Sequence, residues 1–410
     1  MNFSEIQIIG EEKTFRGSKS GITIDTCSIP LTPVTMSNKP HKERTLIKAF
    51  GITALAILIL ACAAGAAPFA YVTSRGIDIG TVFVIDTATD NLTAVVPVGG
   101  WPRDVVVNPV GTKVYVATPG PASTTVSVID TATNTVSARV DAGSYPMEVA
   151  VNPTGSRVYV TDRDNTNISI IDTATNTLME PINVGLITRN VAINPNGKKI
   201  YATNIFNNTT SVIDAITNKV TTTVPVGDSP YEVAVSPDGN KVYVTNSGTN
   251  TVSVIDTATN TVIANVSVGA GPCDVAVSPD GKKAYVTNSG SYNDPGNTVS
   301  IIDTATNNVT ATVNVGTTPL GVAVTPDGKK VYVANARSDN VSVIDTTTNK
   351  VTATVNAGKY YINHPTKVAI GPLTDSDMTA QSTGAISNTT EDINAAELNN
   401  SKKNNSESDN

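Results

Sequence analysis

The stretch YEVAVSPDGNKVYVTNSGTNTVSVIDTATNTVIANVSVG, Tyr231 to Gly269, decides the fold, because its motifs recur seven times along a chain of 410 residues. The unit is about 42 residues long and fills residues 69–371, a period typical of propeller blades. The recurring turn aspartates are Asp86, Asp130, Asp172, Asp214, Asp256, Asp303 and Asp345. The recurring strand tyrosines are Tyr71, Tyr115, Tyr159, Tyr201, Tyr243, Tyr285 and Tyr332.

Each unit predicts four short β-strands, which we call a to d. Strand a is VAV, strand b is KVYVTN, strand c is VSVID, and strand d ends in Val-Gly. Asp-Gly or Asn-Gly between a and b suits a tight hairpin, since glycine adopts positive φ without strain. A four-stranded sheet cannot bury both of its faces alone. The units must therefore stack around an axis, which predicts an all-β, seven-bladed β-propeller.

The two ends of the array predict how the ring closes. The first unit begins at a strand b, FAYV from Phe69 to Val72, and the last strand is a lone strand a, KVAI from Lys367 to Ile370. Together they complete one blade, and this removes an exposed sheet edge. We therefore expect the C-terminal strand to join the first blade.

The motifs VYVTN, VSVIDTATNTV and VAVSPDGK resemble the YVTN β-propeller repeat family, best known from archaeal surface-layer proteins. The resemblance covers about three quarters of the chain. It implies placement at the cell envelope, with an envelope glycan or a surface-layer protein as partner. Several Asn-x-Ser/Thr sequons in and after the repeats match glycan acceptors of exported proteins, among them Asn167, Asn208, Asn265, Asn308, Asn340 and Asn388.

Composition divides the chain into four parts. Residues 1–48 are a polar segment in which Met36 is an alternative start, and residues 49–67 are apolar. A basic flank before residue 49 and Ala64-Gly65-Ala66 near its end predict a secretory signal peptide, with a retained membrane anchor as the alternative. Residues 68–372 are the propeller, and the polar residues 373–410 predict a disordered tail. We expect an extracellular or cell-surface protein.

The residue inventory restricts the chemistry. The net charge of −7 argues against nucleic acid as a partner. Only two histidines are present, too few for a multi-histidine metal centre, and no nucleophile elbow or phosphate-binding loop is found. We therefore favour a non-catalytic scaffold without a catalytic residue. The alternative is a lactonase- or streptogramin-lyase-like propeller enzyme with a metal at the top of the axis. Its site residues would have to be Glu148, Glu232, Asp274 and His364.

Departures from the repeat concentrate on one face of the predicted ring. The d-to-a and b-to-c connections share a face, here called the top, and hold the only Trp and every Tyr outside the strand positions. Aromatic and arginine enrichment is typical of a recognition surface. The predicted partner-binding residues are Trp101, Arg103, Tyr145, Arg189, Tyr231, Tyr292, Tyr360 and Tyr361.

The position before the first valine of each strand a predicts a second feature at the top of the axis. It reads Asp104, Glu148, Asn190, Glu232, Asp274, Gly321 and Lys367 around the ring. Oxygen ligands suit Ca²⁺, so Asp104, Glu148, Glu232 and Asp274 form a candidate calcium site. The alternatives are a solvated acidic mouth, or neutralisation by Lys367, Arg103 or Arg189.

Overall fold

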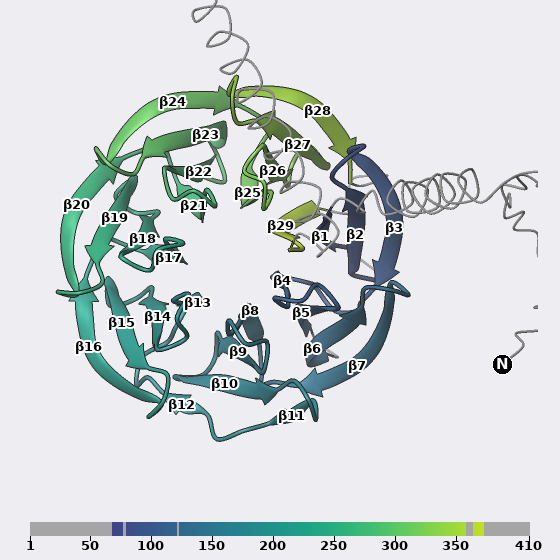
Figure 1. The fold of residues 1–410 in the computed structure, drawn as a ribbon, viewed down its shortest axis with the longest axis vertical. Coiled ribbons are helices and arrows are strands. Elements are labelled where there is room, and N and C mark those ends of the chain that lie inside the picture. Colours follow the sequence, from purple (N-terminus) through teal and green to yellow (C-terminus); the bar gives the residue numbers. More distant parts are fainter. Residues whose placement is uncertain (1–67, 77–78, 121–122, 358–363, 373–410) are drawn as a thin grey trace, which may run out of the picture. The chain divides into compact units, whose positions relative to one another are not determined.

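The computed structural model describes residues 68–76, 79–120, 123–357 and 364–372, all of which belong to one compact unit, Ala63–Asn410. Seven antiparallel sheets stand around a central axis like the blades of a propeller (Figure 1). The first strand of each repeat lies nearest the axis and the last lies on the outside. The seven-bladed propeller predicted from the repeats is confirmed.

The strands follow the predicted order within every blade. Blade 1 is β29 (His364–Ile370), β1 (Phe69–Arg75), β2 (Thr81–Asp86) and β3 (Asn91–Pro97). Blade 2 is β4 (Val105–Val107), β5 (Lys113–Gly120), β6 (Ser123–Asp130) and β7 (Thr135–Asp141). Blade 3 is β8 (Pro146–Val151), β9 (Arg157–Asp162), β10 (Asn167–Asp172), and an outer strand split into β11 (Thr177–Leu178) and β12 (Ile182–Asn183).

The remaining blades are regular. Blade 4 is β13 (Val191–Ile193), β14 (Lys199–Asn204), β15 (Thr209–Asp214) and β16 (Lys219–Pro225). Blade 5 is β17 (Pro230–Val235), β18 (Lys241–Asn246), β19 (Thr251–Asp256) and β20 (Thr261–Ser267). Blade 6 is β21 (Pro272–Val277), β22 (Lys283–Gly290), β23 (Pro295–Asp303) and β24 (Asn308–Asn314). Blade 7 is β25 (Pro319–Val324), β26 (Lys330–Asn335), β27 (Asn340–Asp345) and β28 (Lys350–Asn356).

The ring closes through the C-terminal strand. Strand β29 pairs with β1 in antiparallel register, with Tyr71 opposite Ala369 and Val72 opposite Val368. Val368 also packs into a cluster with blade 7 residues such as Tyr332. The predicted closure is therefore confirmed, and it joins two ends of the described chain that are almost 300 residues apart.

The core lies between the blades and consists mainly of repeated valines and tyrosines. Tyr243 of blade 5, for example, is fully buried in one cluster with Val275 and Val286 of blade 6. The predicted core role of the strand tyrosines is confirmed, since all seven are buried. The turn aspartates also act as predicted, because Asp256 accepts hydrogen bonds from the Thr259 amide and hydroxyl, both at 2.8 Å.

Several predictions concern residues outside the described ranges. The polar segment 1–48, the signal peptide or anchor at 49–67, the tail 373–410 and the residues Tyr360 and Tyr361 all fall there. Within the ranges that are described, no helix is long and apolar enough to cross a membrane.

Candidate axial binding site

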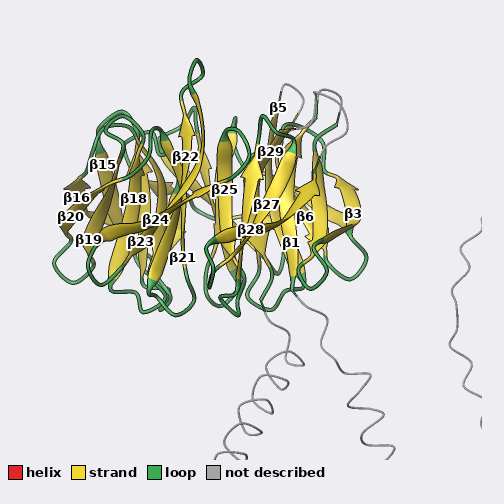
Figure 2. Cartoon of the chain, turned by 90° about the horizontal axis from the view of Figure 1, so that it is seen from above, coloured by secondary structure: helices red, strands yellow, loops and turns green. Residues whose placement is uncertain are grey.

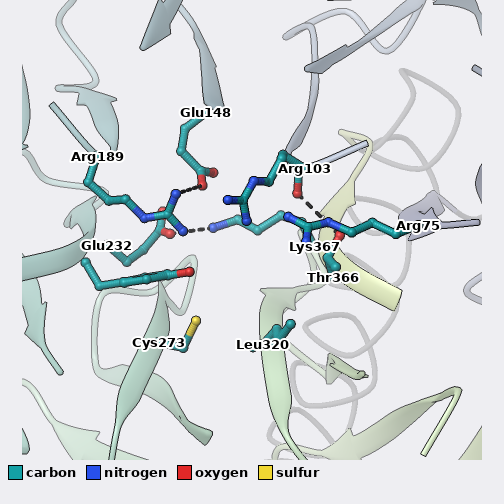
Figure 3. A pocket seen from close by; sticks show the side chains of 10 residues that line it. Arg75, Arg103, Glu148, Arg189, Glu232, Cys273, Leu320, Thr366 and Lys367 are labelled. Atoms are coloured by element: carbon teal, nitrogen blue, oxygen red, sulfur yellow. Dashed lines mark hydrogen bonds and ion pairs between the residues drawn. The ribbon is translucent and has the colours of Figure 1, made fainter. Parts of the chain in front are cut away.

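Two adjacent positions at the start of each innermost strand bring non-repeated residues together near the axis. The first position holds Arg103, Met147, Arg189, Tyr231, Cys273, Leu320 and Thr366. The second holds Asp104, Glu148, Asn190, Glu232, Asp274, Gly321 and Lys367. A cavity of about 70 Å³ is lined by residues of both positions and by Arg75 from the end of β1 (Figure 3).

The repeated threonine of strand b fixes where these positions lie. The hydroxyl of Thr245 accepts a hydrogen bond from the Glu232 amide at 2.9 Å and donates one to the Cys273 carbonyl of the next blade at 3.0 Å. Thr203 and Thr287 make the equivalent pairs of bonds in their blades. Each threonine thus ties one blade to the start of the next innermost strand, so hydrogen bonds between threonine hydroxyls and backbone groups position the wall of the site.

Blade 2 has no hydroxyl at this place, because Ala117 replaces the threonine. There the carboxylate of Asp104 makes the connection, since its Oδ2 accepts a hydrogen bond from the Val149 amide of blade 3 at 2.7 Å. Asp274 accepts from Val322 of blade 7 in the same way, at 2.9 Å. These two aspartates therefore have a structural role in addition to their charge.

Acidic and basic side chains pair across the axis. The Lys367 ammonium lies 2.7 Å from Glu232 Oε2 and 3.1 Å from Asp274 Oδ1. The Arg189 guanidinium lies 3.7 Å from Glu148 Oε1, and Figure 3 shows Glu148, Arg189, Glu232 and Lys367 together at the cavity. Gly321 gives Lys367 its place, because a Cβ at residue 321 would lie only 2.6 Å from the Lys367 Cα.

Burial controls the electrostatics of the cluster. Burial raises the pKa of Asp104 well above its usual range, and the neighbouring Glu148 carboxylate adds to the effect. Burial also raises the pKa of Glu232, against the opposing attraction of Lys367. Burial alone would lower the pKa of Lys367, but Asp274 and Glu232 outweigh it and raise that pKa well above its usual value. The ammonium therefore stays charged beside carboxyl groups whose proton affinity is high.

Two cations near the cavity, Arg75 and Arg103, form no ion pair with a carboxylate in the described part of the chain. Burial and the nearby Arg103 lower the pKa of Arg75 to about 10, and burial and Arg189 lower the pKa of Arg103. The Nε atoms of Arg75 and Arg103 are buried without a hydrogen-bond acceptor among the described residues. Arg75 was not among the predicted site residues, because it ends a strand b and belongs to neither axial position. Its signal in the sequence was its place among the arginines of the top connections.

The four acidic side chains at the axis are not exposed to solvent as the solvated-mouth alternative predicted. Asp104, Glu148, Glu232 and Asp274 are all buried, so the solvated mouth is wrong. The structure instead shows neutralisation by Lys367 and Arg189, as the remaining alternative proposed. In the described part of the chain, no three His, Cys, Asp or Glu residues form a group that could hold a metal ion. Calcium binding stays a prediction that this geometry does not favour.

The predicted partner-binding residues separate into two sets. Trp101 and Tyr292 are exposed, at 40% and 85%, on the loops of the top face. Arg103, Arg189 and Tyr231 lie at the cavity, where the Arg189 guanidinium stacks 4.0 Å from the centre of the Tyr231 ring.

Tyr145 belongs to neither set and is intermediate in exposure. The Arg163 guanidinium stacks on it, 3.9 Å from the ring centre. One further aromatic residue belongs to the exposed set. Phe206 is 77% exposed in the β14–β15 hairpin of the same face, and the sequence interpretation missed it because it considered only Tyr and Trp. Its signal was a bulky apolar residue in a turn that the repeat fills with small polar ones.

The residues of the enzyme alternative do not meet in one group. His364 Nδ1 lies 2.8 Å from the Ala336 carbonyl and 3.1 Å from Asp339, whereas Glu232 and Asp274 contact Lys367. The Cys273 thiol faces the cavity, but burial and Asp274 raise its pKa to about 12. Such a thiol is a poor nucleophile at neutral pH.

Comparison with known proteins supports the fold more than the function. The family model described as YNCE-like beta-propeller matches residues 291–383, and no curated protein matches. Hydrazine synthase of Kuenenia stuttgartiensis is 26% identical, with a TM-score of 0.55 over 60% of this chain and 76% of that chain. A functionally unknown protein of Desulfotomaculum acetoxidans is 19% identical, with a TM-score of 0.64 over 74% of this chain and 99% of that chain.

A further solved structure bears on the enzyme alternative. A Bacteroides fragilis protein described as a "putative 6-phosphogluconolactonase" is 18% identical, with a TM-score of 0.61 over 74% of this chain and 98% of that chain. An identity this low shows a shared fold alone. The chain is thus a β-propeller by both structure and family match, while the YVTN surface-layer type stays a prediction.

Proposed function

We propose that this propeller is a non-catalytic binding or structural scaffold of the cell envelope, and that it recognises an envelope glycan or a surface-layer protein through its top-face loops. The placement at the envelope rests on the N-terminal sequence and on the YVTN-type repeats, as set out above. The recognition surface rests on the exposed aromatic residues, which we call the rim set: Trp101, Phe206 and Tyr292.

The observation that carries the proposal is the way Tyr292 is presented. It lies at the tip of the β22–β23 hairpin, which stands above the other loops of the ring in Figure 2. Arg337 of blade 7 donates a hydrogen bond to the Tyr292 carbonyl at 3.0 Å, and its guanidinium lies 4.9 Å from the centre of the ring. A large aromatic side chain is thus held in solvent by contacts from a second blade, an arrangement suited to contacting a partner.

Trp101 is presented by a similar connection between elements. Its amide donates a hydrogen bond to the Pro119 carbonyl at 2.7 Å, which ties the β3–β4 connection to the β5–β6 hairpin. Loops fixed in this way on a rigid ring lose little conformational entropy when a partner binds.

The test is a binding screen of the purified full-length protein against envelope glycans and surface-layer protein. We expect a ligand whose affinity falls by more than about tenfold in Trp101→Ala or Tyr292→Ala, since aromatic hot spots contribute about 2 kcal/mol or more. Ile216→Ala is the matched control, because Ile216 is 78% exposed in a turn on the opposite face.

Equal loss in the control, or no ligand from either class, would contradict the proposal. The same preparations should be assayed for lactone hydrolysis and streptogramin lyase activity, with metal analysis. Turnover that Glu148→Gln abolishes would establish the enzyme alternative instead.

A further inference from the structure

The axial cavity is rich in arginine side chains, which the proposed partner binding at the rim set does not involve. Its lining includes three guanidinium groups, from Arg75, Arg103 and Arg189, yet among the described residues only Arg189 forms an ion pair with a carboxylate. Arg75 reaches the cavity from strand β1 of blade 1, Arg103 from the β3–β4 connection and Arg189 from the β12–β13 connection, so the cluster exists only in the closed ring (Figure 3).

The carboxylates near the cavity are already engaged elsewhere. Glu232 and Asp274 contact Lys367, and Asp104 accepts the Val149 amide. Glu148 contacts Arg189 through one oxygen, while its Oε2 has no described hydrogen-bond partner. Leaving charged groups buried and unpaired is costly. The more distant Glu148 carboxylate attracts Arg103, but neither Arg103 nor Arg75 makes an ion pair with a carboxylate of the described residues.

The cavity has room for a small anion. A buried water needs about 10–15 Å³ of such volume, so the observed volume of about 70 Å³ admits several waters or one small oxyanion. The planar fork of an arginine side chain matches the oxygens of a carboxylate or a phosphate group, with which it forms two parallel hydrogen bonds. The apolar part of the lining, from Leu320 and the Tyr231 ring, limits how much water can screen this interaction.

We propose that the axial cavity is a binding site for a small oxyanion, the carboxylate or phosphate group of a ligand, held by the guanidinium groups of Arg75 and Arg103 with Arg189 beside them. The site is independent of the rim set, so its test needs no macromolecular partner. The unpartnered Oε2 of Glu148 favours a ligand oxyanion that lies on the Arg75 and Arg103 side of the cavity, because like charges repel.

The experiment is calorimetric titration of the full-length protein with inorganic phosphate and, separately, with acetate, at constant ionic strength. We expect saturable binding of at least one anion, and the stronger of the two identifies the ligand group. Arg103→Gln and Arg75→Gln should each weaken binding by about 10- to 100-fold, the range expected for a charged hydrogen bond. Arg157→Gln removes the same charge at the start of β9, on the opposite face, and should bind as the unchanged protein does.

Thermal unfolding provides the second measurement, because phosphate stabilises many proteins without binding a site. A site-specific effect raises the melting temperature of the unchanged protein and of Arg157→Gln more than that of Arg103→Gln. Arg103→Lys keeps the charge but loses the fork, and should give intermediate affinity if it folds. Absence of binding by the unchanged protein, or equal weakening in Arg157→Gln, would overturn the proposal and leave the rim proposal unaffected.

Discussion

The ammonium of Lys367 lies 2.7 Å from Oε2 of Glu232, so the strand that closes the ring also supplies the cation that compensates the acidic side of its axis. Lys367 comes from blade 1 and Glu232 from blade 5, and Asp274 of blade 6 is 3.1 Å from the same ammonium. Closure and electrostatics are therefore coupled through one residue, which makes the closing strand the most informative place to perturb.

Truncation tests the closure. Deleting residues 364–410 removes β29 and exposes the β1 edge together with Val72, whereas deleting residues 373–410 removes none of the described strands. Loss of the buried Val368 alone costs about 2 kcal/mol, so we expect the first deletion to lower the melting temperature by more than about 5 °C. The second deletion should match the intact protein in circular dichroism melts. Identical melting of all three proteins would contradict closure by β29.

Removing the central cation should destabilise the ring. In Lys367→Met, Glu232 and Asp274 lose their common partner while remaining buried, and we expect a loss of about 3–5 kcal/mol in urea unfolding. Adding Glu232→Gln removes one of the uncompensated charges and should recover a substantial part of that loss. A double variant as unstable as the single one would show that Lys367 contributes through packing rather than charge.

The threonine connection between blades has its own test. Thr245→Val keeps the shape but leaves the Glu232 amide and the Cys273 carbonyl without the hydroxyl, at an expected cost of about 1–3 kcal/mol. Thr223→Val, on the exposed side of the outer strand β16, serves as the control and should change stability by less than about 0.5 kcal/mol. Comparable effects of the two substitutions in denaturant melts would exclude a special role for Thr245.

Truncating an aromatic residue at the axial cavity should destabilise the protein more than truncating one of the exposed top-face aromatics. The sequence alone predicts that Trp101 and Tyr231 contribute little to folding, but Tyr231 is covered by Arg189 near the axis. Because Tyr231 is half-buried and stacked on Arg189, we expect Tyr231→Ala to cost about 1–3 kcal/mol and the more exposed Trp101→Ala to cost less. Calorimetric melting of both variants decides between these expectations. Equal melting temperatures would show that Tyr231 contributes as little to folding as Trp101 does.

The hydrogen bonds of the turn aspartates should make their contribution to the stability of the protein depend on pH. Hydrogen bonds from the Thr259 amide and hydroxyl hold the pKa of Asp256 below its usual value. A lowered folded-state pKa stabilises the protein above the unfolded value, about 3.9, and this contribution disappears as pH falls through the folded pKa. The stability difference between the intact protein and Asp256→Asn should therefore shrink from pH 7 to pH 2. A difference that is constant or grows on acidification, measured in urea at fixed ionic strength, would contradict the assignment.

The sequence by itself determined the strands, the seven blades and the closing pair, because each depends on short-range patterns repeated seven times. It also determined that residues such as Glu232 and Lys367 occupy equivalent positions around one axis. A regular repeat makes its own average structure predictable, and departures from it indicate where function lies.

Only the tertiary structure decided which of those residues meet, and whether water reaches them. Burial of Asp104 and Glu232, the pairing of Lys367 with two carboxylates, and the arrival of Arg75 from the end of β1 depend on the ring radius and on how long side chains cross it. Neither the ring radius nor the path of a long side chain across it can be inferred from the repeat pattern. The physical reason is that a charge is compensated by whichever group lies within a few ångströms, and here those groups come from blades far apart in the chain.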